Sequence, residues 1–408
     1  MILQGKNVVL GVTGGIAYYK AVDLCSRLVQ AGAGVDVIMT EGATRFVTPL
    51  PFQTITKRPV AVDMFQLLRD VDMAHISLAE KADLLVIAPA TANTIAKIAH
   101  GLADNLLTST VLATTAPLVI APAMDADMWA NPVTQANVET LRSRGAVMVG
   151  PAVGRLASGR IGAGRLVSTE ELLASMRQTL GRRGAMAGRR VTVTAGGTQE
   201  ALDPVRHLTN RSSGRMGYAL AEATRDAGAQ VLLIHAPTGL PAVHGVRMQP
   251  ARSAADMETA VLEALPQTDV LIMAAAVADY RPAHAAAQKI KKDPSGAGLV
   301  LELERTTDIL AAVAARPERE RPHVVVGFAA ETQDLLANAQ TKLRAKRLDL
   351  VVANDVSASG SGFEVDTNRV TLLTPDGREE ALPLLSKFEA AERIVARVAQ
   401  LWDARQHG

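Results

Sequence analysis

The sequence has little cysteine, little net charge and no long hydrophobic run. One cysteine in 408 residues, Cys25, excludes an internal disulfide framework and argues against a zinc–thiolate site. The net charge of +2 provides no overall field that would favour a nucleic acid or a membrane surface. No apolar run reaches the roughly 18 residues that a membrane-spanning helix needs. The opening MILQGKNVVLGV predicts a first strand rather than a signal peptide, so we expect a cytoplasmic protein.

Apolar residues, by contrast, make up 48% of the chain, enough for sizeable cores. The length exceeds that of one ordinary core and predicts two domains. In both halves, strands that are apolar throughout alternate with helical patterns, which predicts parallel sheets covered on both faces. The expected fold class is α/β, with two doubly wound, Rossmann-like domains and mostly parallel sheets. The Gly/Arg-rich residues 181–190 predict a linker between domains 1–180 and 191–408.

Two features near the C-terminus complete this outline. Residues 363–374 alternate in polarity and predict a late hairpin with its turn at Asp366–Asn368. The amphipathic stretch from Leu384 to Trp402 predicts a closing helix.

Each half begins with a strand that runs into glycines. Residues 8–17 read VVLGVTGGIA, and residues 191–200 read VTVTAGGTQE. Such a turn lets backbone N–H groups approach an anion, and a following helix N-terminus adds its positive dipole end. Neither half has the G-x-G-x-x-G spacing of dinucleotide folds, and a purely structural tight turn fits the first glycines equally well. The repeated opening predicts two mononucleotide sites, and therefore two activities.

The first half resembles a family of flavin-containing enzymes. It carries GVTGGIA, then HISL at His75, then ADLLVIAPATANTIAKIAHGLADNLL, then PAMDADMW at 122–129. These pieces are similar to the homo-oligomeric flavin-containing cysteine decarboxylases. The resemblance implies FMN as cofactor and His75 as the active-site histidine, an imidazole suited to proton transfer near neutral pH. It also implies a flavin site formed by Gly14, Gly15, Ala90, Thr91, Met124 and Asp125.

Two residues depart from that family's pattern. The family has an asparagine that contacts the substrate carboxylate where this chain has Asp125, and an ionised aspartate repels a carboxylate. The family also has a cysteine in a mobile flap, acting as the acid that completes the product, where this chain has Ser158. A hydroxyl is far less acidic than a thiol. We therefore hypothesise that the decarboxylase is impaired or stops after its oxidative step, while FMN binding survives. Cys25 is interpreted as a small buried hydrophobe and not as a substitute.

The second half carries the most specific segment, TAGGTQEALDPVRHLTNRSSGRMG at 194–217. It resembles the signature of phosphopantothenate–cysteine ligases. Taken together, the chain resembles the bifunctional phosphopantothenoylcysteine decarboxylase/phosphopantothenate–cysteine ligase family of coenzyme A biosynthesis, in the same order over essentially all residues. The resemblance implies small-molecule substrates, namely 4'-phosphopantothenate, cysteine and CTP. It assigns the acyl-cytidylate to Asn210 and phosphopantothenate to Arg206 and Ser212, for which capping and surface pairing are the competing explanations.

Three further clusters supply the nucleotide site that the resemblance implies. AAAVADYRP at 274–282 ends a strand at Asp279, a carboxylate suited to Mg²⁺ on the phosphates. QKIKK at 288–292 contains Lys289, which the family places on the triphosphate as a catalytic residue. GFAAET at 327–332 places Phe328 near the base. The implied nucleotide contacts are Ala274, Ala275, Asp279, Lys289, Thr307, Asp308, Ile309, Leu310, Phe328, Lys342 and Lys346.

Other interpretations of the two halves stay open at this point. Two Rossmann-like halves also fit a nicotinamide-dependent dehydrogenase, but that interpretation gives no role to the specific segment at residues 203–217. The two departures also fit a first half that is a non-catalytic flavin-binding scaffold or regulatory module. The resemblance implies trimeric decarboxylase contacts and dimeric ligase contacts, and hence a homo-oligomer as large as a dodecamer. It implies CTP, although no residue type excludes ATP on physical grounds.

Overall fold

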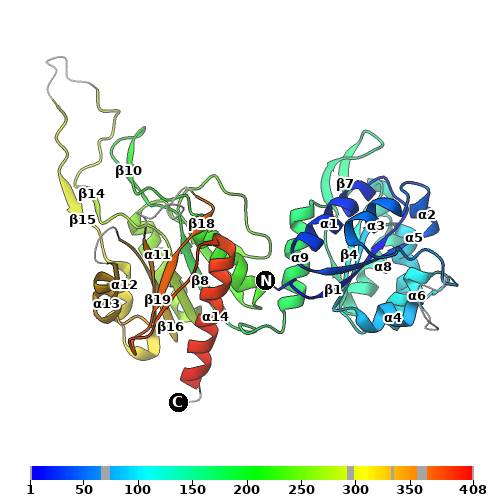
Figure 1. Ribbon diagram of the computed structural model, residues 1–408. Coiled ribbons are helices and arrows are strands. Elements are labelled where there is room, and N and C mark those ends of the chain that lie inside the picture. Colours follow the sequence, from blue (N-terminus) through cyan, green and yellow to red (C-terminus); the bar gives the residue numbers. More distant parts are fainter. Residues whose placement is uncertain (1, 66–73, 292–297, 332–334, 356–364, 407–408) are drawn as a thin grey trace. The chain divides into compact units, whose positions relative to one another are not determined.

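The computed structural model describes residues 2–65, 74–291, 298–331, 335–355 and 365–406. The chain divides into two compact units, Met1–Gly181 and Arg182–Gly408 (Figure 1). The predicted linker region is divided between them. Gly181 ends the last helix of the first unit, whereas Met186 is 1% exposed and packs in the core of the second unit.

In its described part, the N-terminal unit is built on a five-stranded sheet of order β2-β1-β3-β4-β5. All neighbouring strands in it are parallel. The chain starts at β1, moves outward to β2, and then returns past β1 to β3, so the direction of winding reverses between β1 and β3. The strands are β1 (Asn7–Val12), β2 (Gly34–Met39), β3 (Leu84–Ala90), β4 (Leu118–Pro122) and β5 (Val147–Met148).

Helices cover both faces of this sheet (Figure 1). Phe52 of α3 and Met176 of α9 pack with α1 on one face, and Ile95 of α5 and Val138 of α8 pack with α4 and α6 on the other. β3 is buried along its whole length, as its uninterrupted apolar sequence predicts. The helices are α1 (Tyr18–Gln30), α2 (Glu41–Thr44), α3 (Leu50–Thr56), α4 (Ala74–Lys81), α5 (Ala92–Ala99), α6 (Leu106–Ala113), α7 (Ala126–Ala130), α8 (Pro132–Ser143) and α9 (Thr169–Gly181).

A separate antiparallel hairpin, β6 (Ala152–Arg155) and β7 (Ile161–Arg165), follows the sheet. Its tip is closed by hydrogen bonds from Leu156 N to Arg160 O and from Gly159 N to Leu156 O. The base of the hairpin packs tightly on the loop after β4. A Cβ on Gly164 would lie 2.3 Å from the carbonyl oxygen of Met124, so only glycine permits this approach.

In its described part, the C-terminal unit contains an eight-stranded sheet of order β12-β11-β8-β13-β16-β17-β19-β20. Strands from β12 to β17 are parallel, and β19 and β20 add an antiparallel edge. Here the winding reverses between β8 and β13. The strands are β8 (Arg190–Ala195), β11 (Gln230–His235), β12 (Arg247–Pro250), β13 (Val270–Met273), β16 (Val324–Glu331), β17 (Leu350–Asp355), β19 (Val370–Leu373) and β20 (Glu379–Ala381).

Helices again lie on both faces. Leu220 of α10 packs beside Ile394 of α14 on one face, and α11, α12 and α13 pack on the other. The α-helices are α10 (Arg215–Asp226), α11 (Ala254–Ala264), α12 (Ile309–Ala314), α13 (Leu335–Ala345) and α14 (Lys387–Gln406). Short 3₁₀ turns occur at Leu265–Gln267 and Glu318–Glu320.

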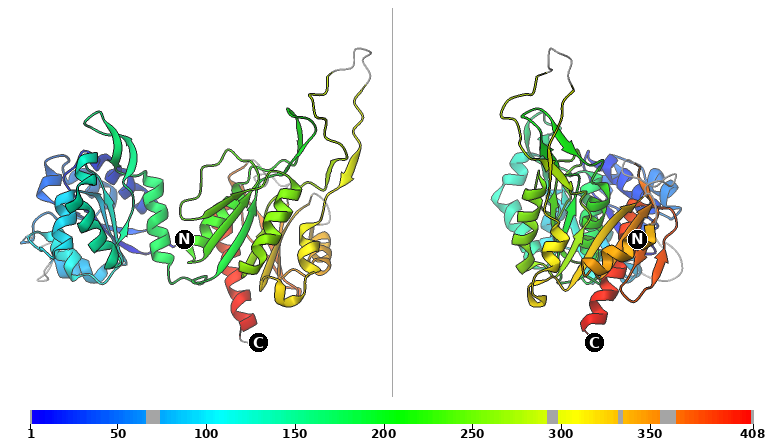
Figure 2. Two further views of the ribbon diagram at one scale, coloured as in Figure 1. Left: turned by 180° about the vertical axis from the view of Figure 1, so that it is seen from behind. Right: turned by 90° about the vertical axis from the view of Figure 1, so that its left-hand side faces the viewer.

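Two slender extensions leave the sheet of this unit (Figures 1 and 2). One is the hairpin of β9 (Gln199–Ala201) and β10 (His207–Thr209). The other is an arm whose base is formed by β14 (Tyr280–Pro282) and β15 (Leu303–Arg305). A small pair, β18 (Thr367–Asn368) and β21 (Leu385–Ser386), completes the unit.

The structure confirms the expected class of two α/β units with mostly parallel sheets and the closing helix, α14. The predicted hairpin with its turn at Asp366–Asn368 is wrong. Residues 367–368 form β18, and the turn lies between β19 and β20, where Gly377 N donates to Thr374 O. Gly377 has φ +83°, a left-handed conformation that glycine adopts without strain, and this favours a turn at that position. Among the described residues, no helix is long and apolar enough to span a membrane.

Candidate functional sites

In the N-terminal unit, β1 and β3 are joined at their carboxyl ends by one buried hydroxyl group. Thr13 Oγ1 donates to the carbonyl of Pro89 at 2.7 Å and accepts the N–H of Thr91 at 3.0 Å. Thr13 is 1% exposed, so this contact fixes the two loops on either side of the winding reversal. Open α/β sheets bind their ligands at this position, beyond the carboxyl ends of the strands that flank the reversal.

The glycine turn after β1 lies close to a second backbone segment. A Cβ on Gly14 would lie 2.9 Å from the carbonyl group of Gly42, whereas one on Gly15 would meet only Pro89 at 3.9 Å. Thr91 caps α5, its side chain accepting the N–H of Thr94 at 3.3 Å. Small residues, free approach to the backbone and a helix N-terminus are what a flavin phosphate requires.

His75 lies near the start of α4 and is half-buried. Its Nδ1 is inaccessible to solvent and finds no hydrogen-bond partner among the residues that the structure describes. A buried polar atom in this situation is uncommon, and a water molecule, an ion or a ligand is what normally completes it. Gly14, Gly15, Ala90 and Thr91 therefore fit such a cofactor, because they place small residues and a helix N-terminus at the sheet reversal.

The two residues that depart from the family pattern are in contact. Ser158 Oγ, at the tip of the β6–β7 hairpin, donates to Asp125 Oδ2 at 2.7 Å. Asp125 caps α7 and accepts the N–H of Asp127 at 3.1 Å. The hydroxyl of Ser158, followed by the N–H of Asp127 and the charge of Arg160, holds the pKa of Asp125 below its ordinary value. Asp125 is therefore ionised at neutral pH, and the only proton of the Ser158 side chain is directed at it.

A second contact joins the same two segments. Arg160 Nη1 lies 2.5 Å from Asp127 Oδ2 in an exposed ion pair. The hairpin tip is thus attached at two points to the N-terminal turn of α7. Cys25 takes no part in this site: it is fully buried in α1, and burial raises the pKa of its thiol to about 12.

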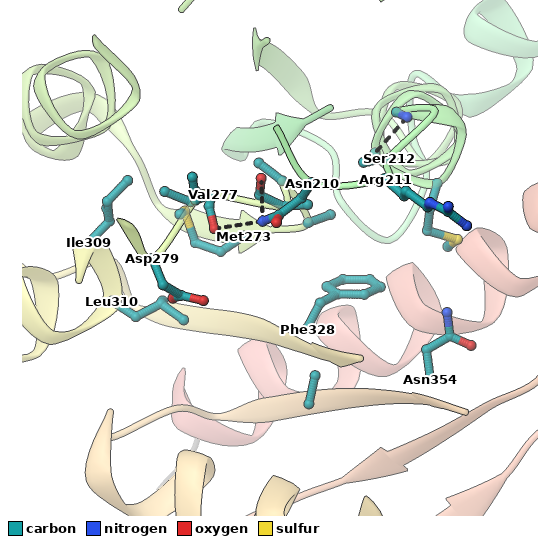
Figure 3. A pocket seen from close by; sticks show the side chains of 18 of the residues that line it. Asn210, Arg211, Ser212, Met273, Val277, Asp279, Ile309, Leu310, Phe328 and Asn354 are labelled. Carbon is teal, nitrogen blue, oxygen red and sulfur yellow. Dashed lines mark hydrogen bonds between the residues drawn. The ribbon is translucent and has the colours of Figure 1, made fainter. Parts of the chain in front are cut away.

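In the C-terminal unit, a cavity of about 600 Å³ opens at the reversal between β8 and β13 (Figure 3). Its wall joins the segment before α10, the loop after β13, the start of α12, and the ends of β16 and β17. Of the residues predicted from the sequence, those that line the cavity are Asn210, Ser212, Ala274, Ala275, Asp279, Thr307, Asp308, Ile309, Leu310, Phe328 and Lys342.

The floor of this cavity is the loop after β13. Asn210 donates from Nδ2 to the carbonyls of Ala276 at 3.4 Å and Val277 at 3.1 Å, which anchors its amide over the strand ends. A Cβ on Gly197 would lie 2.7 Å from the carbonyl oxygen of Asn210, so the glycine lets the two segments approach. The same loop is held by Thr194, whose Oγ1 accepts the N–H of Ala275 at 3.0 Å.

The N-terminus of α10 forms another side of the cavity. Gly214 precedes the helix with φ +75°, and its N–H donates to Ser212 Oγ at 3.4 Å. The first turn of α10 has no acidic residue. The positive end of the helix therefore faces the cavity without a neutralising carboxylate of its own, and it favours an anionic ligand.

Phe328, Lys342 and Lys346 lie toward α12 and α13. Lys342 Nζ donates to the carbonyl of Phe328 at 2.7 Å, and the ring of Phe328 lies in the cavity (Figure 3). Lys346 does not line the cavity but pairs with Asp308, which caps α12. Burial acts to raise the pKa of Asp308, but the hydrogen bond from Lys346 and the N–H of Ala311 lower it below the ordinary value.

Besides Lys346, two further predicted residues lie outside the lining of the cavity. Lys289 is an exposed residue of the arm, outside the lining of the cavity. Arg206, also outside the lining, donates to Asp203 and to the carbonyl of Ile290. Conversely, sequence reasoning missed Arg215, Asn368 and Lys387, which line the cavity. Asn354 belongs to the ANDV sequence, which is expected to end a strand at this edge, and it also lines the cavity, whereas nothing in the sequence brings Asn368 or Lys387 there.

In the described part of the chain, no three His, Cys, Asp or Glu side chains gather where a metal ion could bind. Asp279 is exposed at the edge of the cavity and offers a single carboxylate. This fits Mg²⁺ that is held by one or two carboxylates together with substrate phosphates, the usual mode for phosphoryl-transfer enzymes.

Comparison with known proteins assigns both halves. Residues 2–181 match the Flavoprotein family, and residues 186–401 match the DNA/pantothenate metabolism flavoprotein C-terminal domain. A protein of Bacillus subtilis is 46% identical over 98% of each chain, and one of Vibrio cholerae is 45% identical over 96% of this chain and 98% of its own. One of Mycobacterium tuberculosis is 47% identical over 96% of this chain and 95% of its own. Each is a coenzyme A biosynthesis bifunctional protein CoaBC, and this chain belongs to the same family.

Proposed function

We propose that the C-terminal half couples 4'-phosphopantothenate to cysteine in a reaction driven by CTP. The observation that carries this proposal is the cavity at the β8/β13 reversal, where Asn210, Asp279, Phe328 and Lys342 meet the N-terminus of α10. Cations and helix N–H groups suit a triphosphate, an aromatic face suits a base, and an amide that donates and accepts suits a mixed anhydride.

In the proposed reaction, a carboxylate oxygen of phosphopantothenate attacks the α-phosphorus of CTP, and pyrophosphate leaves. The amine of cysteine then attacks the acyl carbon, and CMP leaves as the amide forms. Lys342 and the α10 N-terminus stabilise negative charge on the phosphates. Asp279 would hold Mg²⁺, which would neutralise charge on the phosphates, and Asn210 would orient the acyl group. Lys289, carried by the arm, adds a further cation to the triphosphate.

The test is CTP-dependent release of pyrophosphate in the presence of both co-substrates. Release that requires phosphopantothenate, and a condensed product that requires cysteine, support the proposal. CTP left unconsumed with both co-substrates present overturns it. Replacing CTP by ATP in the same assay decides which nucleotide is used.

For the N-terminal half we propose FMN-dependent decarboxylation of the condensed product to 4'-phosphopantetheine. Bound FMN supplies reversible two-electron chemistry. Gly14, Gly15, Ala90, Thr91 and Met124 would shape its cradle, and His75 would hold or move a proton through its imidazole, whose Nδ1 has no partner among the described residues. FMN absorbance in the purified protein tests this binding, and its absence after reconstitution contradicts it.

We further propose that this decarboxylation is slow. The ionised carboxylate of Asp125 repels the substrate carboxylate, and Ser158 directs its proton to Asp125 and not to the product. Flavin bound without any turnover would instead favour a first half that serves as a flavin-binding scaffold. We propose that the chain forms homo-oligomers through both halves, up to a dodecamer, which native mass spectrometry would test.

A further inference from the structure

The turn that connects β9 to β10 contains a buried carboxylate. Asp203 is 4% exposed, and its Oδ1 accepts the N–H groups of Val205 and Arg206, each at 2.8 Å. Leu202 N donates to Arg206 O at 2.9 Å and closes the turn. A buried carboxylate needs partners of this kind, because burial without them is costly.

The same carboxylate reaches the neighbouring arm. Asp203 Oδ2 accepts from Arg206 Nε at 2.9 Å and Nη2 at 2.6 Å, and from the N–H of Ile290 at 3.1 Å. Arg206 Nη2 also donates to the carbonyl of Ile290 at 2.8 Å. Both backbone groups of Ile290 are therefore held by one Asp–Arg pair. Ala286 N donates to Leu202 O at 2.9 Å and attaches the arm at a second point.

Ile290 directly follows Lys289, the lysine that the proposed ligase mechanism assigns to the triphosphate. Lys289 lies outside the lining of the cavity, so its reach to the nucleotide depends on how the arm is held. We propose that Asp203 is a positioning residue of the ligase, which acts through Arg206 and the backbone of Ile290 to hold the segment that carries Lys289. This inference rests on the proposed ligase function.

The electrostatics agree with this geometry. The side-chain hydrogen bond from Arg206, and then the N–H groups of Val205, Ile290 and Arg206, hold the pKa of Asp203 well below its ordinary value. Asp203 is therefore charged throughout the neutral range, and its bonds to Arg206 and Ile290 stay charge-assisted. The sequence predicts that Arg206 binds phosphopantothenate, whereas its guanidinium is engaged by Asp203 and the arm.

The structural part of the inference is tested on the resting protein by hydrogen exchange. In Asp203→Asn, exchange at the Ile290 amide should accelerate by about tenfold or more, since the charged acceptor of this N–H is lost. Asp376→Asn is the control for the loss of one aspartate charge, because Asp376 forms an exposed pair with Arg378 in the β19–β20 turn, away from the arm. This control should leave exchange at Ile290 and ligase kinetics unchanged. Unaltered exchange at Ile290 in Asp203→Asn overturns the inference.

The functional part is tested by a double-mutant cycle with Lys289→Ala. Asp203→Asn alone should lower kcat/KM for CTP by up to about 10²-fold, the cost of misplacing a catalytic group by roughly 1 Å. Combined with Lys289→Ala it should cause no further loss, because the residue being positioned is already absent. Losses that multiply would show that Asp203 acts independently of Lys289 and would contradict the proposal.

Arg206→Lys is the second variant, which keeps the charge but loses the planar fork, and it serves if Asp203→Asn does not fold. It should reproduce both effects. A rise in KM for phosphopantothenate alone, retained in the Lys289→Ala background, would show that Arg206 binds substrate directly and would overturn the positioning role. If the wild type lacks ligase activity while exchange at Ile290 still responds, the proposed function fails and the attachment of the arm stands.

Discussion

The two halves of the chain use the same architecture but differ in the residues placed at the sheet reversal. In the C-terminal half, residues expected from the ligase resemblance surround one cavity, among them Asn210, Asp279 and Phe328. In the N-terminal half small residues lie at the reversal, but Asp125, which follows β4, and Ser158, in the β6–β7 hairpin, stand where the family resemblance implies an asparagine and a cysteine. These two substitutions touch each other at 2.7 Å.

The difference shows how a cofactor site and a reaction site can diverge independently. The cradle depends on backbone approach and small side chains, and Gly14 supplies these whatever residue lies at 125. The proton donor at position 158 and the contact to the substrate carboxylate at position 125 each depend on one side chain. Because these two side chains touch, a change at one position alters the chemistry of the other. The hydrogen bond from Ser158 to Asp125 engages the hydroxyl proton of Ser158 and keeps the carboxylate of Asp125 ionised. We therefore expect the two substitutions to act as one unit.

The largest expected effect separates the halves. Asn210→Ala removes the amide that is anchored to the carbonyls of Ala276 and Val277 and that the proposed mechanism assigns to orienting the acyl group. Ligase kcat should fall by about 10²-fold, the scale expected when a reacting group is no longer held in place. FMN absorbance should stay unchanged in the same preparation. A ligase that retains wild-type kcat would place the acyl intermediate elsewhere.

The next effect tests the flavin half by reversing both substitutions. Asp125→Asn combined with Ser158→Cys should raise turnover of phosphopantothenoylcysteine by about 10²-fold, because a positioned proton donor contributes on this scale. The ligase rate is the internal control and should not change. The gain of the double variant should exceed the product of the gains of the two single variants, because the two side chains act as one unit. If the double variant is no faster than wild type, these residues do not limit decarboxylation.

A pH profile gives a smaller and more specific effect. The pKa of Asp125 lies below the ordinary aspartate pKa of about 3.9. The carboxylate is therefore ionised at any pH above that ordinary pKa, and it loses its charge only at a lower pH. The ratio of decarboxylation rates for Asp125→Asn and wild type should therefore stay constant between about pH 6 and 8. A ratio that shrinks toward pH 6 would mean that Asp125 protonates there and donates to the substrate.

The smallest effect concerns Cys25, where we expect none. Its thiol is fully buried, and burial raises its pKa to about 12, so a thiol reagent should label it only after unfolding. Ser158→Cys under native conditions is the positive control, since residue 158 is exposed. Rapid labelling of Cys25 in the native wild type would reopen its interpretation as a substitute for the flap thiol.

Much of this comparison could be predicted from the sequence. The alternation of apolar strands with helical patterns predicted both sheets. A strand that is buried on both faces is a continuous apolar run, and this run is easily distinguished from the amphipathic helices beside it. The contact between residues 125 and 158 could not, since it depends on how the β6–β7 hairpin folds back over α7. Arg206 shows the same limit. Its motif is visible, and so is its neighbour Asp203, but its guanidinium also donates to the carbonyl of Ile290, a contact across more than 80 positions that no local pattern encodes.

The hairpin turn predicted at Asp366–Asn368 failed for a related reason. Its Asp and Asn favour turns locally, yet Asn368 is 2% exposed and belongs to β18, which pairs with the distant β21. Tertiary pairing therefore overrode local turn preference. The turn instead forms at Gly377, whose positive φ is a requirement that local sequence does encode.

The central claim is that one half is an efficient ligase and the other a slow decarboxylase. The most direct measurement is mass spectrometry of the products formed by the FMN-loaded protein with CTP, 4'-phosphopantothenate and cysteine. The account predicts that phosphopantothenoylcysteine accumulates well ahead of 4'-phosphopantetheine. Phosphopantetheine that appears without accumulation of its precursor, or a mixture in which CTP is unchanged, would contradict it.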